Sequence, residues 1–415
     1  MDAIKLSICI PTYNRAPFLR KLLTHLKSDA RFDFRFEIVV SDNASTDNTE
    51  EVAQEFIAQG LPLRYFRRPE NGGGWPNMTC AFLRSEGEFA IYVADDDLPI
   101  CDGIAAAIAY LDRNPDVVAC YAPWLLHDEI DKKDTGQFYR VKQDTKFANR
   151  SFPELFQFIF EGHVFPEIGI YRTSELRSAY VPREFCFWAF AYLAHFLDKG
   201  AVAFLERPFY RSVTRSSVRR DRQQAGHEEV MTAWDRYRGG LEYFLYVGTK
   251  RGRIGTAADQ RQRVDEMCKI FTLNRMAVAL RFWVARKDYI KAYELYVRLV
   301  FGGLSHHDEV KKVRDMLPLM AGVQTFARQV NATTGINRLI LSNVADVPSL
   351  SGLLYEVGLD RSVEVTGELA DDASVRREQT MVFTTTAAER DKFIARGYAP
   401  NLVFYENDLT AHLIV

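Results

Sequence analysis

Three consecutive carboxylates, Asp95-Asp96-Asp97, directly follow the apolar run at residues 89–94. Adjacent negative charges repel each other, so such a cluster is costly unless a cation or hydrogen-bond donors neutralise it. Hard oxygen ligands suit Mg²⁺ or Mn²⁺, and these metals commonly bridge protein carboxylates to substrate phosphates. A solvated loop before a helix at Asp102 is the alternative. The apolar run before the triplet and Leu98-Pro99 after it favour the metal site.

Asp42 ends a second apolar run at residues 36–41. A carboxylate at that position could accept the ring N–H of a uracil, thymine or guanine base. A turn or helix-cap role is the alternative, and it is the preferred interpretation for the neighbouring Asp47. Asn71-Gly72-Gly73-Gly74 has neither the lysine nor the spacing of a Walker loop. A flexible turn is its simplest explanation, although its place before a helix at Pro76 would allow backbone close to a diphosphate.

The elements that must position these residues alternate between short apolar runs and amphipathic stretches, which predicts a parallel α/β sheet. The expected strands are residues 6–10, 36–41, 63–66 and 89–94. In an open α/β sheet, ligands bind at the carboxyl ends of the strands. The polar clusters at 12–15, 42–43 and 95–97 all fall at such ends, and this coincidence is the strongest functional signal in the chain.

Beyond residue 115 the pattern changes twice. Mixed structure is expected to about residue 220, with strands at 117–122, 168–172 and 201–205, and then an almost wholly helical region at 226–331. A second small α/β unit follows, with expected strands at 339–341, 363–365, 381–383 and 402–405. We therefore predict three parts, residues 1–222, 223–335 and 336–415.

Composition excludes several classes of protein. Lys and Arg total 53 against 55 Asp and Glu, a net charge of -2, so no global basic field exists and no nucleic-acid partner is expected. No apolar run approaches the roughly 18 residues needed to cross a bilayer, and the N-terminus lacks a signal-peptide pattern. Six cysteines without a CxxC motif indicate buried thiols. We expect a cytoplasmic protein.

Four segments occur in a characteristic order: CIPTYNR, VVSDNASTDNT, NGGGWPN and GEFAIYVADDDLP. They resemble the motifs of a family 2 inverting glycosyltransferase with the GT-A fold, the Rossmann-like fold of nucleotide-diphospho-sugar transferases. The resemblance is strong over about the first 110 residues and fades over the next 110. It implies a nucleotide-contacting loop formed by Pro11, Thr12, Tyr13 and Arg15, and pairing of Asp42 with the base.

The same resemblance matches Asp95 and Asp97 to the outer members of the DxD motif. Asp97 is then the expected main ligand of Mn²⁺ or Mg²⁺, and Asp95 lies nearer the ribose or the metal. Asp96 and Asn71 complete the expected nucleotide-binding set. The implied donor is a nucleoside-diphosphate-sugar of the UDP, GDP or dTDP type, bound by residues 1–110. The implied acceptor is a glycan, lipid-linked or protein hydroxyl, on the side formed by residues 111–222.

Inverting transfer needs a carboxylate general base that removes the acceptor proton. Family members carry a Glu-Asp pair just before a Trp, but the corresponding stretch here, Glu184-Phe185-Cys186-Phe187-Trp188, has Cys186 and Phe187 at the acidic positions. Glu184 is the first candidate for the base and Glu167 is the second. Either could instead pair with a nearby arginine, Arg183 or Arg172. A second departure is Val213, which stands where many members place a histidine that reaches the metal.

Two other functions stay open on these residues. One is a non-catalytic nucleotide-sugar-binding scaffold, because the Glu-Asp pair is missing; the other is a sugar nucleotidyltransferase, for which PTYNRAPF is a poor signature. The arginines between 211 and 222 could close over a diphosphate or contact an anionic lipid headgroup, although a solvated basic loop is the default. Peripheral contact with the inner face of a membrane and a homo-oligomer are both compatible with the sequence. Residues 226–415 are expected to serve acceptor selection or self-association.

Overall fold

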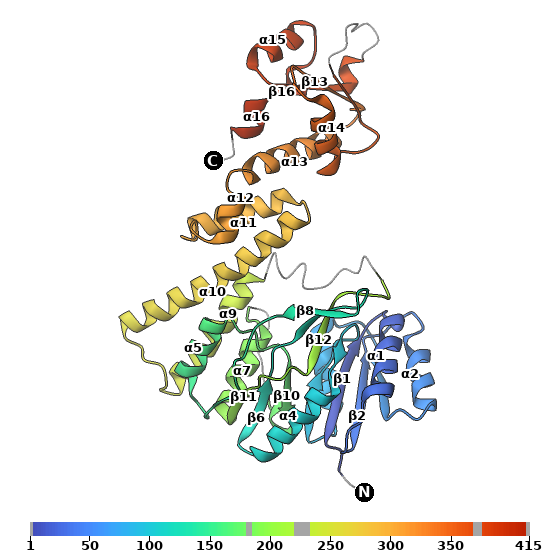
Figure 1. Ribbon diagram of the computed structural model, residues 1–415, viewed down its shortest axis with the longest axis vertical. Helices are drawn as coiled ribbons and strands as arrows, with labels where there is room; N and C mark the ends of the chain where they lie inside the picture. The colour runs from blue at the N-terminus through green and yellow to red at the C-terminus, as the bar shows by residue number, and fades with distance from the viewer. Residues whose placement is uncertain (1–2, 180–184, 220–232, 368–375, 412–415) are drawn as a thin grey trace. The chain divides into compact units, whose positions relative to one another are not determined.

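The computed structural model describes residues 3–179, 185–219, 233–367 and 376–411. The chain divides into two compact units, Met1–Phe271 and Thr272–Val415 (Figure 1). The three-part division expected from the sequence, with boundaries at 222 and 335, stays a prediction.

An eight-stranded mixed sheet forms the core of the first unit, in the order β3-β2-β1-β4-β10-β6-β11-β9. Its strands are β1 (Leu6–Thr12), β2 (Phe36–Asp42), β3 (Leu63–Arg67), β4 (Phe89–Tyr92), β6 (Val117–Tyr121), β9 (Thr145–Phe147), β10 (Gly169–Arg172) and β11 (Ala201–Phe204). The first four are parallel to one another. β10 runs antiparallel to both β4 and β6. This reversal brings the start of β10 to the carboxyl ends of its neighbours.

The central strands are fully buried because helices cover the sheet, which is why they read as continuous apolar runs. Leu6, Ile8, Cys9 and Ile10 of β1 have no exposed surface. Pro11 is tolerated in this strand because it lies beyond Cys9, the last residue of β1 that pairs with β4.

The helices of this unit are α1 (Ala16–Asp29), α2 (Thr49–Ala58), α3 (Gly74–Arg84), α4 (Cys101–Arg113), α5 (Phe152–Gly162), α6 (Thr173–Arg177), α7 (Trp188–Lys199) and α9 (Trp234–Lys250). α1 shows how sequence dictates them. Pro17 lies in its first turn, and its apolar residues recur at helical spacing on one buried face: Phe18, Leu19, Leu22, Leu23 and Leu26.

A second, four-stranded sheet in this unit has the order β5-β12-β7-β8. Its strands are β5 (Leu98–Pro99), β12 (Tyr210–Arg215), β7 (Leu125–Asp128) and β8 (Lys133–Gln137). β12 pairs antiparallel with β5, so Arg211 lies opposite Leu98. The expectation of a solvated basic loop is therefore wrong for residues 210–215, which form a strand. The pairing matters for the site because β5 directly follows the aspartate triplet.

The second unit holds the end of α10 (Ala258–Ala285), then α11 (Tyr289–Phe301), α12 (Asp308–Val313) and α13 (Leu317–Ala332). Four parallel strands follow in the order β14-β13-β15-β16: β13 (Arg338–Ser342), β14 (Glu364–Gly367), β15 (Thr380–Thr384) and β16 (Val403–Tyr405). The accompanying helices are α14 (Val347–Glu356), α15 (Ala387–Ala395) and α16 (Glu406–Thr410), with short 3₁₀ turns at Arg377–Gln379 and Pro400–Leu402.

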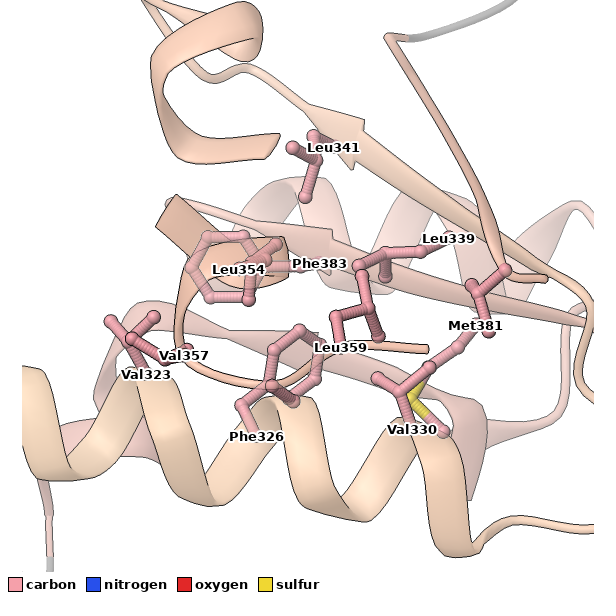
Figure 2. Packing of buried hydrophobic residues seen from close by; sticks show 12 residues of the cluster. Val323, Phe326, Val330, Leu339, Leu341, Leu354, Val357, Leu359, Met381 and Phe383 are labelled. Atoms are coloured by element: carbon pink, nitrogen blue, oxygen red, sulfur yellow. The ribbon is translucent and has the colours of Figure 1, made fainter. Parts of the chain in front are cut away.

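Figure 2 shows the core of this unit, where Phe326 and Val330 of α13 pack beneath Leu339, Met381 and Phe383 of the sheet. The arrangement predicted from the sequence is confirmed: an N-terminal α/β sheet, a helical middle and a small C-terminal parallel sheet. All six cysteines lie in the described residues and are thiols. None of the described helices combines the length and the apolar composition that a membrane span requires.

Candidate functional site

The polar clusters predicted at three strand ends meet at one edge of the large sheet. Thr12 and Asp42, the last residues of β1 and β2, lie opposite each other in register. The hydroxyl of Thr12 donates to Oδ2 of Asp95, which follows β4, over 2.7 Å. Because parallel strands share a carboxyl edge, residues 83 positions apart in the sequence come into contact.

Arg15 neutralises part of the aspartate triplet. Its Nη1 lies 2.9 Å from Oδ1 of Asp95 and 2.7 Å from Oδ2 of Asp96. Burial alone would lower the pKa of Arg15, but the two carboxylates raise it, so the guanidinium stays charged. Burial and the charge of Asp96 raise the pKa of Asp95 to about 6, against the opposing effects of Arg15 and Thr12. Arg15 therefore belongs to the carboxylate cluster.

Asp97 is held by strand β12. Its Oδ2 accepts from the hydroxyl of Tyr210 over 2.8 Å, and its Oδ1 accepts from the backbone N–H of Val213 over 2.7 Å. The same Tyr210 oxygen accepts from the backbone N–H of Ala94 over 3.1 Å. Burial, and then the charge of Asp97, raise the pKa of Tyr210 well above its ordinary value, so it remains a donor. Sequence reasoning missed Tyr210, because no local pattern pairs residues 97 and 210.

The donor chemistry of the triplet fits a hard divalent cation. All the side-chain atoms that the triplet offers to a metal are carboxylate oxygens. Asp97 accepts hydrogen bonds from two neutral groups, whereas Asp95 and Asp96 both contact the Arg15 guanidinium. Within the described residues, no three His, Cys, Asp or Glu side chains already converge as a set of metal ligands. Phosphate oxygens and water would have to complete the coordination, as is usual for Mg²⁺.

Asp42 is almost fully buried, at 1% exposure. Its Oδ1 accepts from the N–H and the hydroxyl of Ser45, at 2.9 and 2.5 Å, and its Oδ2 accepts from the hydroxyl of Tyr65 at 2.5 Å. Burial and the bond to Asp42 raise the pKa of Tyr65. Tyr65 was not predicted, although a signal existed: it stands two residues before Arg67, which pairs with Asp42 across the strands, so both tyrosine and arginine share the face of Asp42.

Hydrogen bonds join the glycine-rich turn at residues 71–74 to Asn43, the residue after β2. Oδ1 of Asn71 accepts from Nδ2 of Asn43 over 2.6 Å and from the N–H of Gly73 over 2.9 Å. Gly73 has φ near +88°, a conformation in which a side chain would be strained. Asn71 thus shapes the turn before α3. Tyr13, the residue that follows β1, is 40% exposed.

The two candidates for the general base have different outcomes. Glu184 lies outside the described residues. Glu167 stands two residues before β10, and since β10 is antiparallel to β4, it lies at the edge where β4 ends. Burial raises the pKa of Tyr92, and the charges of Asp97, Asp96, Asp95 and Glu167 raise it further. Glu167 and the triplet therefore lie within electrostatic range of the same partly buried tyrosine. Its suggested partner Arg172 contacts Glu88 instead.

Two arginines of the basic stretch form ion pairs on β12. Nε of Arg211 lies 3.0 Å from Asp134, and Nη1 of Arg215 lies 2.7 Å from Asp128. The predicted Arg220 and Arg222 lie outside the described residues. Arg211 and Arg215 thus tie β12 to β7 and β8, which supports the strand that holds Asp97.

Comparison with known proteins bears on this site. Residues 7–169 match the family described as Glycosyl transferase family 2. The abequosyltransferase RfbV of Salmonella typhimurium is 31% identical over 177 residues, which cover 42% of this chain and 50% of that protein. The poly(ribitol-phosphate) beta-N-acetylglucosaminyltransferase TarS of Staphylococcus aureus is 32% identical over 115 residues, covering 27% of this chain and 19% of that protein. The chain thus spans half or less of the length of these relatives.

Solved structures give a weaker likeness. Residues 1–349 of S. aureus TarS in complex with UDP-GlcNAc align with a TM-score of 0.45 and 19% identity, covering 76% of this chain and 86% of that chain. The mannosyltransferase PcManGT from Pyrobaculum calidifontis, in complex with GDP-Man and Mn²⁺, aligns with a TM-score of 0.43 and 17% identity, covering 79% and 88%. The sequence match, with its four motifs in order on the α/β sheet, shows that residues 7–169 form a glycosyl transferase family 2 domain.

Proposed function

We propose that this protein transfers a sugar from a nucleoside-diphosphate-sugar to an acceptor hydroxyl, with inversion and with the assistance of Mn²⁺ or Mg²⁺. The observation that carries the proposal is the cluster of Thr12, Arg15, Asp95 and Asp97 at the carboxyl edge of the family 2 domain. Carboxylates that hydrogen bonds and an ion pair hold at one edge of the sheet could bind a divalent cation beside a diphosphate, as metal-assisted transfer requires.

On the donor side, Asp42 would accept the ring N–H of the base. It would keep its orientation through Ser45 and Tyr65, which already donate to both of its oxygens. Because Asp42 is so deeply buried, the hydroxyl of Tyr65 must share Oδ2 of Asp42 with the ring N–H, or give up its bond to that oxygen, when a base binds. A donor of the UDP, GDP or dTDP type satisfies this pairing. The backbone around Asn71 and Gly73 would lie beside the diphosphate.

At the triplet, Asp97 would hold the metal, and Asp95 would contribute from its place beside Arg15 and Thr12. Bound Mn²⁺ or Mg²⁺ would neutralise the negative charge that develops on the departing nucleoside diphosphate. Tyr210 and Val213 hold the Asp97 carboxylate in one orientation, so little reorganisation is needed on binding. Arg15 balances the remaining carboxylate charge.

On the acceptor side, Glu167 is the general base that the topology favours among the described residues. Inversion requires the acceptor hydroxyl to attack from the face opposite the leaving group, and the base must accept its proton there. β10 supplies Glu167 from the side of β4 away from β1 and β2, where the nucleotide would bind. Glu184 stays the alternative base.

The acceptor class follows from the relatives only as a proposal. One relative is named for abequosyl transfer and another for N-acetylglucosaminyl transfer to poly(ribitol-phosphate). We place this protein in the synthesis of a bacterial surface glycan, with a glycan, a lipid-linked glycan or a protein as acceptor. Residues 111–222 would form the acceptor side, while residues 223–415 would select the acceptor, join two copies or contact the inner face of a membrane.

The nature of the released product tests the reaction class. Purified protein would be incubated with UDP-, GDP- and dTDP-sugars, Mn²⁺ and a membrane extract as acceptor source, and the nucleotides analysed by chromatography. A transferase releases nucleoside diphosphate. Pyrophosphate release would indicate a nucleotidyltransferase, and donor binding without any product would indicate a scaffold. Glu167→Gln should abolish release while donor binding persists, and release that survives in this variant but not in Glu184→Gln would assign the base to Glu184.

A further inference from the structure

Two tryptophans meet at the edge of the large sheet where the aspartate triplet lies. Trp75 stands in the first turn of α3, and Trp188 is the first residue of α7. Their ring centroids are 6.0 Å apart, and Tyr192 lies 5.6 Å from Trp75 and 5.8 Å from Trp188. Neither tryptophan is fully buried, whereas Tyr192 is 4% exposed. The two indoles therefore have surface to offer a ligand.

The pair is the open end of a stack of aromatic rings. Below it, Tyr192 packs on Phe196 at 5.7 Å, and Phe196 packs on Tyr171 of β10 at 4.9 Å. Phe196 and Tyr171 are at most 2% exposed. Every residue of α7 from 189 to 194 is buried, so Trp188 differs from the six positions that follow it. The stack gives the two indoles a rigid support.

The position of Trp75 is fixed against the aspartate triplet. Asn77, two residues further along α3, donates from Nδ2 to the carbonyl of Thr12 over 3.1 Å. Thr12 in turn donates to Asp95. A short chain of hydrogen bonds thus joins the first turn of α3 to the carboxylates, and Trp75 stands next to it.

The position of Trp188 follows from topology. α7 ends at Lys199 and Gly200 leads directly into the start of β11, which is parallel to β6. The first residue of α7 therefore lies at the opposite, carboxyl edge of those strands. β6 and β11 are separated from β1 and β2 by β4 and β10. One tryptophan of the pair thus comes from the helix that follows β3, on the side of the sheet with Asp42. The other comes from the helix that precedes β11, on the side beyond β10.

We infer that Trp75 and Trp188 form an aromatic subsite that binds a pyranose ring of a carbohydrate acceptor. One face of a pyranose presents C–H groups, which pack on the electron-rich face of an indole, and the rigid side chain loses little entropy on binding. The nucleotide base would lie elsewhere, at Asp42 and Tyr65 on β2 and β3. That the bound sugar is an acceptor rests on the proposed function. The sugar-binding surface itself rests only on the positions of the two indole rings.

Saturation-transfer NMR on the full chain tests this subsite. The probes are the methyl glycosides of glucose, galactose, mannose, rhamnose and N-acetylglucosamine, each with and without UDP and Mn²⁺. Wild-type protein should transfer saturation to the ring protons of at least one glycoside. Trp75→Leu and Trp188→Leu, which keep apolar bulk but remove the flat ring, should each weaken binding by about fivefold or more. Trp188→Phe should retain most of it.

The matched control is Tyr246→Leu, which removes another aromatic ring, 55% exposed on α9, and should leave glycoside binding unchanged. A second measurement covers the case in which a leucine variant fails to fold. In wild-type protein with ¹⁵N-labelled tryptophan, the glycoside should shift the indole resonances of Trp75 and Trp188 among the five tryptophans. The Trp188→Phe spectrum identifies one of them.

Several outcomes would overturn the inference: no glycoside receives saturation, the leucine variants bind as wild type does, or the base protons of UDP, rather than the sugar, lose saturation in Trp75→Leu. Thermal unfolding of the same samples with UDP and Mn²⁺ separates this inference from the proposed function. A nucleotide-induced rise in melting temperature without glycoside binding removes the subsite alone. Glycoside binding without any nucleotide response removes the proposed donor site and leaves the subsite.

Discussion

The hydroxyl of Tyr210 donates to Asp97 over 2.8 Å, across 113 positions of sequence. Together with the N–H of Val213, it makes strand β12 the element that orients Asp97. The position where many family members carry a histidine thus contributes a backbone N–H to the carboxylate, and Tyr210 contributes the side chain. This relationship explains how a site without that histidine can still hold Asp97, the proposed metal ligand, in place.

Tyr210→Phe should weaken Mn²⁺ binding severalfold, because Asp97 loses one of the donors that orient it. The substitution also leaves the N–H of Ala94 without its acceptor, which should cost about 1–3 kcal/mol of unfolding free energy. Mn²⁺ titration in the presence of UDP or GDP, followed by electron paramagnetic resonance, measures the first effect. Tyr355→Phe removes a hydroxyl that donates to the carbonyl of Val363 in the second unit and serves as the control, since it should leave Mn²⁺ affinity unchanged. Equal Mn²⁺ affinity in wild type and Tyr210→Phe would rule out this role.

Gly103→Ala should displace the start of strand β12, which carries Tyr210. A Cβ on Gly103 would lie 2.2 Å from the carbonyl oxygen of Pro208 and 2.8 Å from Cα of Phe209, the residues just before β12. Such overpacking typically costs about 1–3 kcal/mol, and the shift should reach Tyr210. Urea unfolding and Mn²⁺ titration should both show a loss. Gly136→Ala on β8 has open space around the added methyl, so it should change neither measurement.

The pH dependence of stability should carry a signature of Asp95. Its pKa is raised to about 6 in the folded chain, whereas an unfolded aspartate titrates near 4. The folded state therefore holds this proton over a window where the unfolded state has lost it. The favourable contribution is complete below about pH 4 and is lost as the pH rises through 6, an effect on the order of 3 kcal/mol. Asp95→Asn should lack this component, so its stability relative to wild type should rise between pH 4 and 7. A constant difference across that range would contradict the assignment.

Phe326→Ala tests the independence of the core of the second unit. Phe326 is 2% exposed and packs on Phe383 and Phe404, so its truncation should cost about 3–5 kcal/mol. Thermal unfolding should show a lower transition temperature for this unit. Leu319→Ala on the same helix, where the side chain is 51% exposed, should have little effect. The nucleotide-dependent stabilisation of the first unit should persist in both variants, and its loss in Phe326→Ala would show that the two cores are coupled.

The elements that could be predicted from sequence are those whose residues are buried on both faces. The strands at 36–41 and 117–122 match β2 and β6 to within one residue, because a strand that is covered on both faces is a continuous apolar run. The convergence of Thr12, Asp42 and Asp95 on one edge followed from the rule that parallel strands share their carboxyl ends.

The elements that could not be predicted depend on long-range pairing. β8 reads KDTGQ and is wholly exposed, and β12 reads YRSVTR, so neither carries a strand pattern of its own. Their strand character comes from partners on β5 and β7. Tyr210 was missed for the same reason: the sequence around it gives no sign that its hydroxyl will reach a carboxylate 113 positions away. The aromatic stack beneath Trp75 and Trp188 likewise exists only once α3, α7 and β10 are brought together.

The central claim is that the strand ends bind a nucleoside-diphosphate-sugar through Asp97 and a divalent metal. The most direct test is thermal unfolding of the full chain with UDP-, GDP- and dTDP-sugars, with and without Mn²⁺, in wild type and in Asp97→Asn. A ligand that binds only the folded state stabilises it by about 2.7 kcal/mol at a hundred times its dissociation constant. We predict a rise in melting temperature for one nucleotide class, dependent on Mn²⁺ and absent in Asp97→Asn. No shift with any nucleotide in folded wild-type protein, or the same shift in Asp97→Asn, would contradict the claim.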